Sequence, residues 1–337
     1  MNRFAASSGK APLLDLRSVS RRFSRPLDLA AKIARALGSR QKEQVVHAVD
    51  DVSLSVYEGE VLGLVGESGC GKSTLGRMMA GILSPSEGKI LYRGMDVNTL
   101  SPEQRREADL KIQMIFQDPF ASLNPRYRVR DIIGEAPRVH RVVPAKEMDA
   151  FLDGIMLKVG LDPEYGQRYP HQFSGGQRQR IGIARALAVR PECIVCDESV
   201  AALDVSIQAQ IINLFIRLRE ELNLTYVFIS HDISVVEHIS DRVVVMYLGR
   251  VVESADTEEL FARPAHPYTH ALLREVPRLD SRHQSFRPVS GEIPSPLNPP
   301  RGCHFHPRCE RAMPICREQA PVLREIVPGH QAACHLL

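Results

Sequence analysis

The feature that most constrains the fold is a glycine-rich stretch, GESGCGKST at residues 66–74, which lies between two apolar runs of different character. The run before it, VLGLVG, is typical of a buried strand, and the run that overlaps its end, TLGRMMAGIL, predicts a helix. This order of strand, loop and helix indicates a phosphate-binding loop, because backbone N–H groups and the helix N-terminus attract an anion. A glycine turn without a ligand is the alternative, and the flanking strand and helix count against it.

The residue types in this loop suit that chemistry. Gly66, Gly69 and Gly71 would let the backbone close around phosphate oxygens. Lys72 would reach the outer phosphates, and Ser73 would coordinate Mg²⁺. The residues expected to contact the nucleotide here are Gly66, Glu67, Ser68, Gly69, Cys70, Gly71, Lys72, Ser73 and Thr74.

A second apolar run ends in two acids, CIVCDE at residues 193–198. Phosphoryl transfer needs a metal and a positioned nucleophile, so we expect Asp197 to hold Mg²⁺ through water and Glu198 to orient and polarise the attacking water. An acid pair that ends a strand could instead be merely solvated. His231 follows the run TYVFIS, where a neutral imidazole could sense the γ-phosphate and bridge to Glu198, although a lone histidine is more often structural.

A second glycine-containing stretch, FSGGQRQR at residues 173–180, precedes the helical run IGIARALAVRP. Its serine and glycines could cap an anion at the N-terminus of that helix. The elements between the two stretches make it hard for both to close on one nucleotide within a single chain. The simplest geometry pairs each stretch with the other stretch of a second subunit, so that two ATP molecules join a head-to-tail dimer.

Strands that alternate with helical stretches predict an α/β domain with a mainly parallel sheet. We expect buried strands at 61–66, 113–117, 192–198 and 225–231 and a late hairpin at 241–255 that turns near Leu248 and Gly249. Cys193 and Cys196 are interpreted as core residues. No run approaches the roughly 18 apolar residues of a spanning helix, so we expect a soluble chain in a reducing cytoplasm. The formal charge of +3 gives no reason to expect nucleic acid as a partner.

The composition changes after residue 263, since the last 74 residues hold 12 of the 23 prolines, 7 of the 12 histidines and 4 of the 7 cysteines. We therefore predict a separate, loop-rich extension at the C-terminus. The predicted division is an N-terminal tail at 1–12, an ATPase domain at 13–263 with a helical subdomain at about 118–190, and the extension at 264–337.

The ordered motifs GESGCGKST, IFQDP, FSGGQRQR, CIVCDE, AALD and SHD resemble those of the nucleotide-binding subunits of ABC transporters. The usual pattern reads LSGGQ and DEP where this chain reads FSGGQ and DES. The resemblance implies a contact of Gln117 with Mg²⁺ and coupling of that residue to the membrane partner. It implies an opposite-subunit phosphate site at Ser174, Gly175, Gly176 and Gln177, a D-loop acid at Asp204, and a catalytic set of Lys72, Gln117, Glu198 and His231.

The aromatic side chain that stacks on the adenine is expected to be Phe23, in SRRFSRP. It lies 49 residues before Lys72, so an insertion must intervene, and LDLAAKIARALGSRQKEQ at residues 27–44 could form a short helix that loops out between two early strands. The alternative is that Phe23 packs in the core.

Further stretches, among them HPYTHALL and GEIPSPLNPPRGCHFHPRC, resemble the ATPases of dipeptide and oligopeptide importers. This resemblance implies a subunit on the cytoplasmic face of the inner membrane, two permease subunits, a similar or identical second ATPase and an extracytoplasmic solute-binding protein. Nickel, glutathione or another small solute is the alternative cargo. A soluble ABC ATPase that acts on ribosomes or DNA would normally carry two cassettes or a large insertion, and a small-molecule kinase would leave the second glycine stretch unexplained.

Four cysteines in the extension, Cys303, Cys309, Cys316 and Cys334, predict a metal centre, because a proline-rich segment with little core needs a staple. Disulfides are disfavoured in the cytoplasm. The wide spacings suit structural zinc poorly, whereas four thiolates suit an iron–sulfur cluster, and the resemblance points to [4Fe–4S]. Zn²⁺ and free thiols stay open as alternatives, and His304, His306 or His335 could substitute as a zinc ligand.

Overall fold

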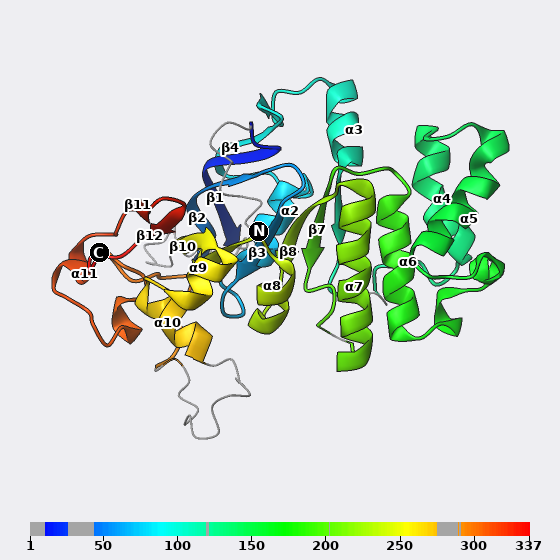
Figure 1. Cartoon of the computed structure of the whole chain (residues 1–337). Coiled ribbons are helices and arrows are strands. Elements are labelled where there is room, and N and C mark those ends of the chain that lie inside the picture. Colours follow the sequence, from blue (N-terminus) through cyan, green and yellow to red (C-terminus); the bar gives the residue numbers. More distant parts are fainter. Residues whose placement is uncertain (1–10, 26–43, 119–120, 202, 275–288, 290) are drawn as a thin grey trace, which may run out of the picture.

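The computed structural model (Figure 1) describes residues 11–25, 44–118, 121–201, 203–274, 289 and 291–337. Most of the expected helix at 27–44 lies outside these residues. Among the helices in the described ranges, we find none that combines the length and the apolar character needed to cross a membrane.

The larger sheet has eight strands in the order β11-β12-β10-β9-β3-β8-β7-β6. Its five strands from β9 to β6 run parallel, as the alternation of strands and helices predicted. The strands are β3 (Val61–Val65), β6 (Ile112–Ile115), β7 (Cys193–Asp197), β8 (Thr225–Ile229), β9 (Arg242–Tyr247), β10 (Arg250–Asp256), β11 (Arg324–Val327) and β12 (His330–Ala332).

The sequence-based strands are confirmed within a residue or two at each end. Cys193 and Cys196 are both fully buried, which confirms their interpretation as core residues. The late hairpin also forms where it was expected, between β9 and β10. Its two turn residues, Leu248 and Gly249, have φ angles of +42° and +81°, the left-handed pair that favours a tight hairpin turn.

A second, smaller sheet of four antiparallel strands has the order β2-β1-β4-β5. These strands are β1 (Leu14–Arg25), β2 (Gln44–Val56), β4 (Glu87–Tyr92) and β5 (Met95–Asp96). Apolar side chains of this sheet, of α2 and of β3 form one buried cluster, so α2 is packed between the two sheets.

The helices cover the parallel strands and extend beyond them in Figure 1, where α4 and α5 lie at the far end of the molecule from β11 and β12. Phe215 of α7 packs edge-on against Tyr226 and Phe228 of β8, with ring centroids 5.5 and 5.9 Å apart. The helices are α2 (Lys72–Met79), α3 (Pro102–Lys111), α4 (Val129–His140), α5 (Met148–Lys158), α6 (Gly175–Leu187), α7 (Val205–Leu222), α8 (Ile233–Ile239), α9 (Thr257–Ala262), α10 (Pro267–Arg274) and α11 (Ile315–Glu318).

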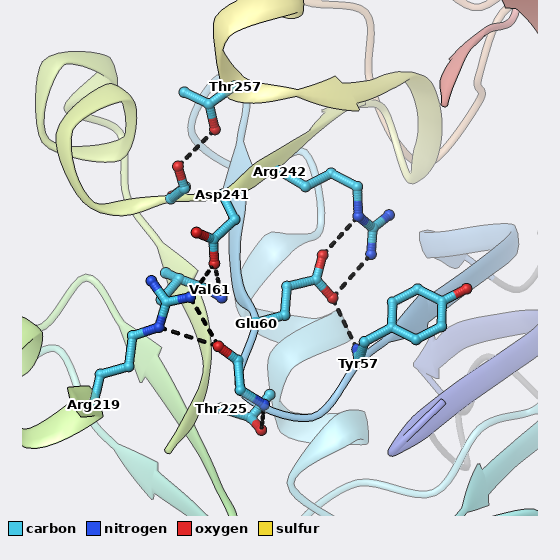
Figure 2. A network of polar contacts seen from close by, with 10 residues as sticks. Tyr57, Glu60, Val61, Arg219, Thr225, Asp241, Arg242 and Thr257 are labelled. Atoms are coloured by element: carbon cyan, nitrogen blue, oxygen red, sulfur yellow. Dashed lines mark hydrogen bonds and ion pairs between the residues drawn. The ribbon is translucent and has the colours of Figure 1, made fainter. Parts of the chain in front are cut away.

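A polar network joins residues at the amino ends of the parallel strands (Figure 2). Glu60 precedes β3 and is 2% exposed, and its carboxylate accepts hydrogen bonds from Nε and Nη2 of Arg242 at 2.7 and 3.3 Å. Oδ2 of Asp241 accepts from Nη2 of Arg219 at 2.5 Å and from the backbone N–H of Val61 at 2.8 Å. Each of these charges has an opposite partner, so the network fastens β3, β9 and α7 to one another.

The C-terminal segment continues the larger sheet. Strand β12 pairs antiparallel with β10, and β11 pairs with β12. His330 of β12 places Nε2 2.7 Å from Oε1 of Glu253 in β10, and both side chains are buried. The segment is thus built onto the edge of the larger sheet, and both the separate extension and the domain boundary at residue 263 stay predictions.

Candidate active site

The loop at residues 66–71 joins the carboxyl end of β3 to α2, and its shape requires glycine at two positions. Gly66 and Gly71 have φ angles of +149° and +106°. A Cβ atom on Gly66 would lie 2.2 Å from the carbonyl oxygen of Met246, and one on Gly71 would lie 2.1 Å from that of Ala48. The strand β2 and the end of β9 therefore confine the loop, and no larger residue fits at either position.

Lys72 is 4% exposed although it carries a charge. Its Nζ donates to the carbonyl oxygens of Gly66 at 2.7 Å and Glu67 at 3.0 Å. Sγ of Cys70 lies 3.8 Å from the same nitrogen, and burial raises the pKa of this thiol. The ammonium group is thus held inside the loop, where an outer phosphate is expected.

Ser73 and Asp197 bring the phosphate loop together with the first acid at the end of β7. The Ser73 hydroxyl donates to Oδ1 of Asp197 at 2.7 Å. Asp197 is 3% exposed, and this burial raises the pKa of its carboxyl against the opposing effect of the Ser73 hydrogen bond. A hydroxyl and a carboxylate side by side are hard oxygen donors of the kind that Mg²⁺ accepts, so these residues fit the predicted metal.

Glu198 lies at the centre of the remaining predicted residues. Nε2 of Gln117 donates to its Oε2 at 2.7 Å, and Nδ1 of His231 lies 3.5 Å from the same oxygen. The backbone of Glu198 has a φ angle of +47°, which is unusual for a residue with a side chain. Such strain is often found at functional sites, because the surrounding structure must hold it. Residues that follow three strands therefore meet at Glu198. The proximity of His231 to Glu198 was expected, whereas the hydrogen bond from Gln117 was not, and the expected contact of Gln117 with Mg²⁺ stays a prediction.

The second glycine-containing stretch is placed differently. Ser174 caps α6: its hydroxyl accepts from the backbone N–H of Gln177 at 3.4 Å, and Oε1 of Gln177 accepts from the N–H of Ser174 at 3.0 Å. A Cβ atom on Gly176 would lie 2.5 Å from Cγ2 of Ile207 in α7, so glycine permits this close packing. Within the described part of the single chain, no hydrogen bond or ion pair joins residues 174–177 to the phosphate loop.

Two other predicted residues lie on the surface. Asp204 is exposed and directly precedes α7. Phe23 is 40% exposed in β1, so the alternative of a core residue is wrong. Cζ of Arg21 lies 4.8 Å from the centroid of the Phe23 ring. Phe23 of β1 pairs with Val46 of β2. Two residues further along β2, the carbonyl oxygen of Ala48 lies close to Gly71. Phe23 therefore lies in the strand next to the one that borders the phosphate loop.

Sequence reasoning missed the contacts of Glu67 in the phosphate loop. Its carboxylate accepts two hydrogen bonds from Arg308, at 2.7 and 2.9 Å. Its backbone N–H donates to the hydroxyl of Tyr268 at 2.9 Å. These partners lie 241 and 201 residues further along the chain, so no local pattern could have revealed them.

The four predicted ligands of the metal centre line one small cavity, together with Phe305, His306 and His335. All four thiols are free, and burial raises the pKa of Cys303 to about 11. However, in the described residues no three side chains of the ligating types are placed to hold one metal ion. His304 lies outside the cavity lining, with Nδ1 3.1 Å from the carbonyl oxygen of Leu248. The thiols converge as expected, but this arrangement does not by itself support a metal centre.

Comparison with known proteins finds matches to both the part of the chain that holds the phosphate loop and the C-terminal part. A family model described as ABC transporter matches residues 49–201, and one described as oligopeptide/dipeptide transporter, C-terminal region, matches residues 252–316. The oligopeptide transport ATP-binding protein AppF of Bacillus subtilis is 56% identical over 295 residues, which cover 86% of this chain and 90% of that protein. The dipeptide transport ATP-binding protein DppF of Haemophilus influenzae is 50% identical over 294 residues, which cover 87% of this chain and 90% of that protein.

The fold also matches solved structures. The dimeric structure of a post-hydrolysis state of the ATP-binding cassette MJ0796, bound to ADP and Pi, superposes with a TM-score of 0.61 at 26% identity. The match covers 72% of this chain and 98% of that chain.

Proposed function

Because this chain belongs to the ABC transporter family of ATP-binding proteins, we propose that it hydrolyses ATP to power the import of dipeptides or oligopeptides through a membrane complex. The observation that carries the proposal is the convergence of Lys72, Ser73, Asp197 and Glu198 at the carboxyl ends of β3 and β7. Nickel, glutathione or another small solute is a less favoured cargo, since both relatives named above are peptide transport proteins.

The proposed mechanism assigns one task to each group. Backbone N–H groups of the loop and the Lys72 ammonium bind the phosphates, and Ser73 and Asp197 would hold Mg²⁺. Bound Mg²⁺ would neutralise charge on the phosphate oxygens. Glu198 orients the attacking water and accepts its proton, while Gln117 and His231 hold the Glu198 carboxylate in place.

We place the second phosphate contact across a dimer. In the part of the chain that the structure describes, no hydrogen bond or ion pair joins Ser174, Gly175 or Gly176 to the phosphate loop, and the similar cassette MJ0796 is dimeric. In a head-to-tail pair this helix N-terminus would face the γ-phosphate bound by the partner. Whether the partner is a second copy or a similar ATPase is part of the test.

A mixed dimer tests this geometry. Ser174→Arg should leave ATP binding at the mutant chain's own phosphate loop intact and should abolish hydrolysis at the site that the mutant completes on its partner. The matched control is His171→Arg, three residues earlier and also exposed. A loss confined to the mutant's own phosphate loop would refute the head-to-tail arrangement.

The proposed complex places this subunit against the cytoplasmic side of the inner membrane, on two permease subunits served by an extracytoplasmic solute-binding protein. Gln117 follows β6 and contacts Glu198. The helices α4 and α5 come next along the chain and lie beyond α6 at one end of the molecule (Figure 1), so this region is suited to report the nucleotide state to a permease. Gln117→Ala should lower the amount of peptide taken up per ATP hydrolysed in reconstituted vesicles, in addition to any loss of turnover from a less firmly held Glu198.

Uptake by vesicles that contain the complete complex tests the cargo. We expect ATP-dependent accumulation of a labelled dipeptide or oligopeptide and none of Ni²⁺ or glutathione. The reverse pattern would transfer the assignment to the alternative. No uptake of any of these solutes, together with ATP-dependent association with ribosomes, would instead favour the soluble class of ABC ATPases.

For the C-terminal segment we propose a [4Fe–4S] cluster on Cys303, Cys309, Cys316 and Cys334, with zinc as the rival. The proposal rests on the four cysteines and on the resemblance given above. The cysteines line one cavity, and binding would require the thiols to move together. Iron and acid-labile sulfide in stoichiometric amounts after anaerobic purification would decide for the cluster. Stoichiometric zinc without iron would decide for the rival, and neither metal would leave the thiols free.

A further inference from the structure

Arg308 is a buried cation in the C-terminal segment that reaches the phosphate loop. It ends a short 3₁₀ turn at His306–Arg308, and its side chain is 4% exposed. Both terminal nitrogens donate to Glu67, Nη1 to Oε2 at 2.7 Å and Nη2 to Oε1 at 2.9 Å. This is a bidentate arginine–carboxylate pair, which is among the strongest hydrogen-bonded contacts between charged side chains. Lysine cannot form it, because it lacks the planar guanidinium group.

The C-terminal segment contacts Glu67 a second time through the backbone. Tyr268, in α10, accepts the Glu67 N–H at 2.9 Å. The carbonyl oxygen of Glu67 in turn accepts from Lys72 Nζ at 3.0 Å. Glu67 thus has its carboxylate and its N–H fixed by distant residues, while its carbonyl contacts the lysine expected to bind the phosphates.

Aromatic packing fixes the two partners of Glu67. The ring centroids of Tyr247 and Tyr268 lie 4.7 Å apart, and the centroid of the Phe305 ring lies 5.2 Å from that of Tyr247 and 5.3 Å from that of Tyr268. Arg308 lies over the Tyr247 ring at 5.8 Å and donates to its hydroxyl at 3.4 Å. The guanidinium and the Tyr268 hydroxyl are therefore held by a rigid cluster between β9 and the C-terminal segment.

A glycine-rich loop needs such support. Three of the six residues at 66–71 are glycines, all three with positive φ, and glycine loses more conformational freedom on ordering than any other residue. A loop that is ordered before ATP arrives does not lose that freedom on binding, so its affinity for ATP is higher. Glu67 is the second residue of this segment, directly after Gly66, and its carboxylate is bound by Arg308.

We propose that Arg308 is a positioning residue for the ATP site: through Glu67 it holds the phosphate loop in its binding conformation, so that ATP affinity depends on the C-terminal segment. The proposal rests on the proposed use of this loop for ATP. It assigns to the C-terminal segment a role inside the ATPase cycle, carried by an ion pair between residues 241 positions apart.

Kinetics of four variants in the full chain test the proposal. Arg308→Met should raise KM for ATP roughly tenfold, the factor that corresponds to one charged hydrogen bond, with kcat nearly unchanged. Glu67→Gln should raise KM by a similar factor, and the double variant should be no worse than either single one, because both remove the same link. Arg317→Met, an exposed arginine of the same segment, is the matched control.

Hydrogen exchange gives a readout that does not depend on ATP. Amides of residues 66–71 should exchange faster in Arg308→Met than in wild type or Arg317→Met. The exchange rate in Arg308→Lys should fall between these values, because lysine keeps the charge but cannot form the bidentate contact. If Arg308→Met does not fold, Arg308→Lys and Glu67→Gln carry the same test. Unchanged KM and unchanged exchange in these variants would overturn the proposal. If the loop exchanges faster in Arg308→Met but the wild-type protein does not bind ATP, the result would count against the proposed function and not against the role of Arg308 in ordering the loop.

Discussion

The parallel strands have two ends with opposite properties. At the amino ends, the buried Glu60 and the partly buried Arg242, Asp241 and Arg219 form a network in which every charge has an opposite partner (Figure 2). At the carboxyl ends, Glu198 sits in a strained left-handed conformation and His231 is 57% exposed. The same strands thus carry paired charges that fasten the sheet at one edge and polar side chains that can reach a ligand at the other.

We interpret this difference as a division of roles, in which residues at the amino ends stabilise the fold and residues at the carboxyl ends carry the chemistry. A buried ion pair contributes little net stability, but removal of one partner leaves a costly uncompensated charge. A catalytic carboxylate, by contrast, must keep a conformation and an exposure that stability alone would not select. We therefore expect substitutions at the carboxyl ends to affect turnover first and substitutions at the amino ends to affect the free energy of unfolding first.

The largest effect is expected from Glu198→Gln, which removes the base and keeps the shape. ATP hydrolysis should fall by about 10²- to 10⁴-fold, while ATP stays bound because Lys72 and Ser73 are intact. Single-turnover assays and ATP binding in the same preparation measure both quantities. Glu237→Gln, on the exposed face of α8, is the control and should hydrolyse ATP at the wild-type rate.

At the other end, Arg242→Met should lower the free energy of unfolding by about 3 kcal/mol, because Glu60 is left buried without its partner. Denaturant unfolding measures this change. Arg22→Met breaks an exposed ion pair with Glu87 and should cost less than about 1 kcal/mol. Equal costs for the two variants would mean that burial does not distinguish the two pairs.

Much of this contrast follows from local sequence. The phosphate loop, the acids Asp197 and Glu198, and His231 each follow an apolar strand pattern, and the carboxyl ends of parallel strands share one edge. The amino-end network could not be predicted in this way. Arg242 and Glu60 lie 182 residues apart, and only the strand order brings them together.

Two other features escaped sequence reasoning for similar reasons. The C-terminal strands join the main sheet through pairing of β12 with β10, which depends on edge accessibility and not on a local pattern. The positive φ angle of Glu198 is imposed by its surroundings, since glutamate has no preference for it. Composition had suggested a separate appendage where the structure pairs β12 with β10, and no sequence pattern had indicated the positive φ angle of Glu198.

The strain at Glu198 yields the smallest predicted effect. Glu198→Gly should be more stable than Glu198→Ala by about 1 kcal/mol, because the two variants differ in a Cβ atom that is unfavourable in the left-handed region. Both should lack hydrolysis. The comparison uses denaturant unfolding of the two variants, and an alanine variant of equal or higher stability would show that this backbone is not strained.

The most direct test of the division between the two ends is the equilibrium affinity for MgATP of two variants that each remove one cation, Lys72→Met and Arg242→Met. Measured at a temperature where both are folded, Lys72→Met should lose ATP binding at its own site, whereas Arg242→Met should bind ATP with the wild-type Kd despite its lower stability. Wild-type affinity in Lys72→Met, or a loss of affinity in folded Arg242→Met, would contradict the assignment of chemistry to one end and stability to the other.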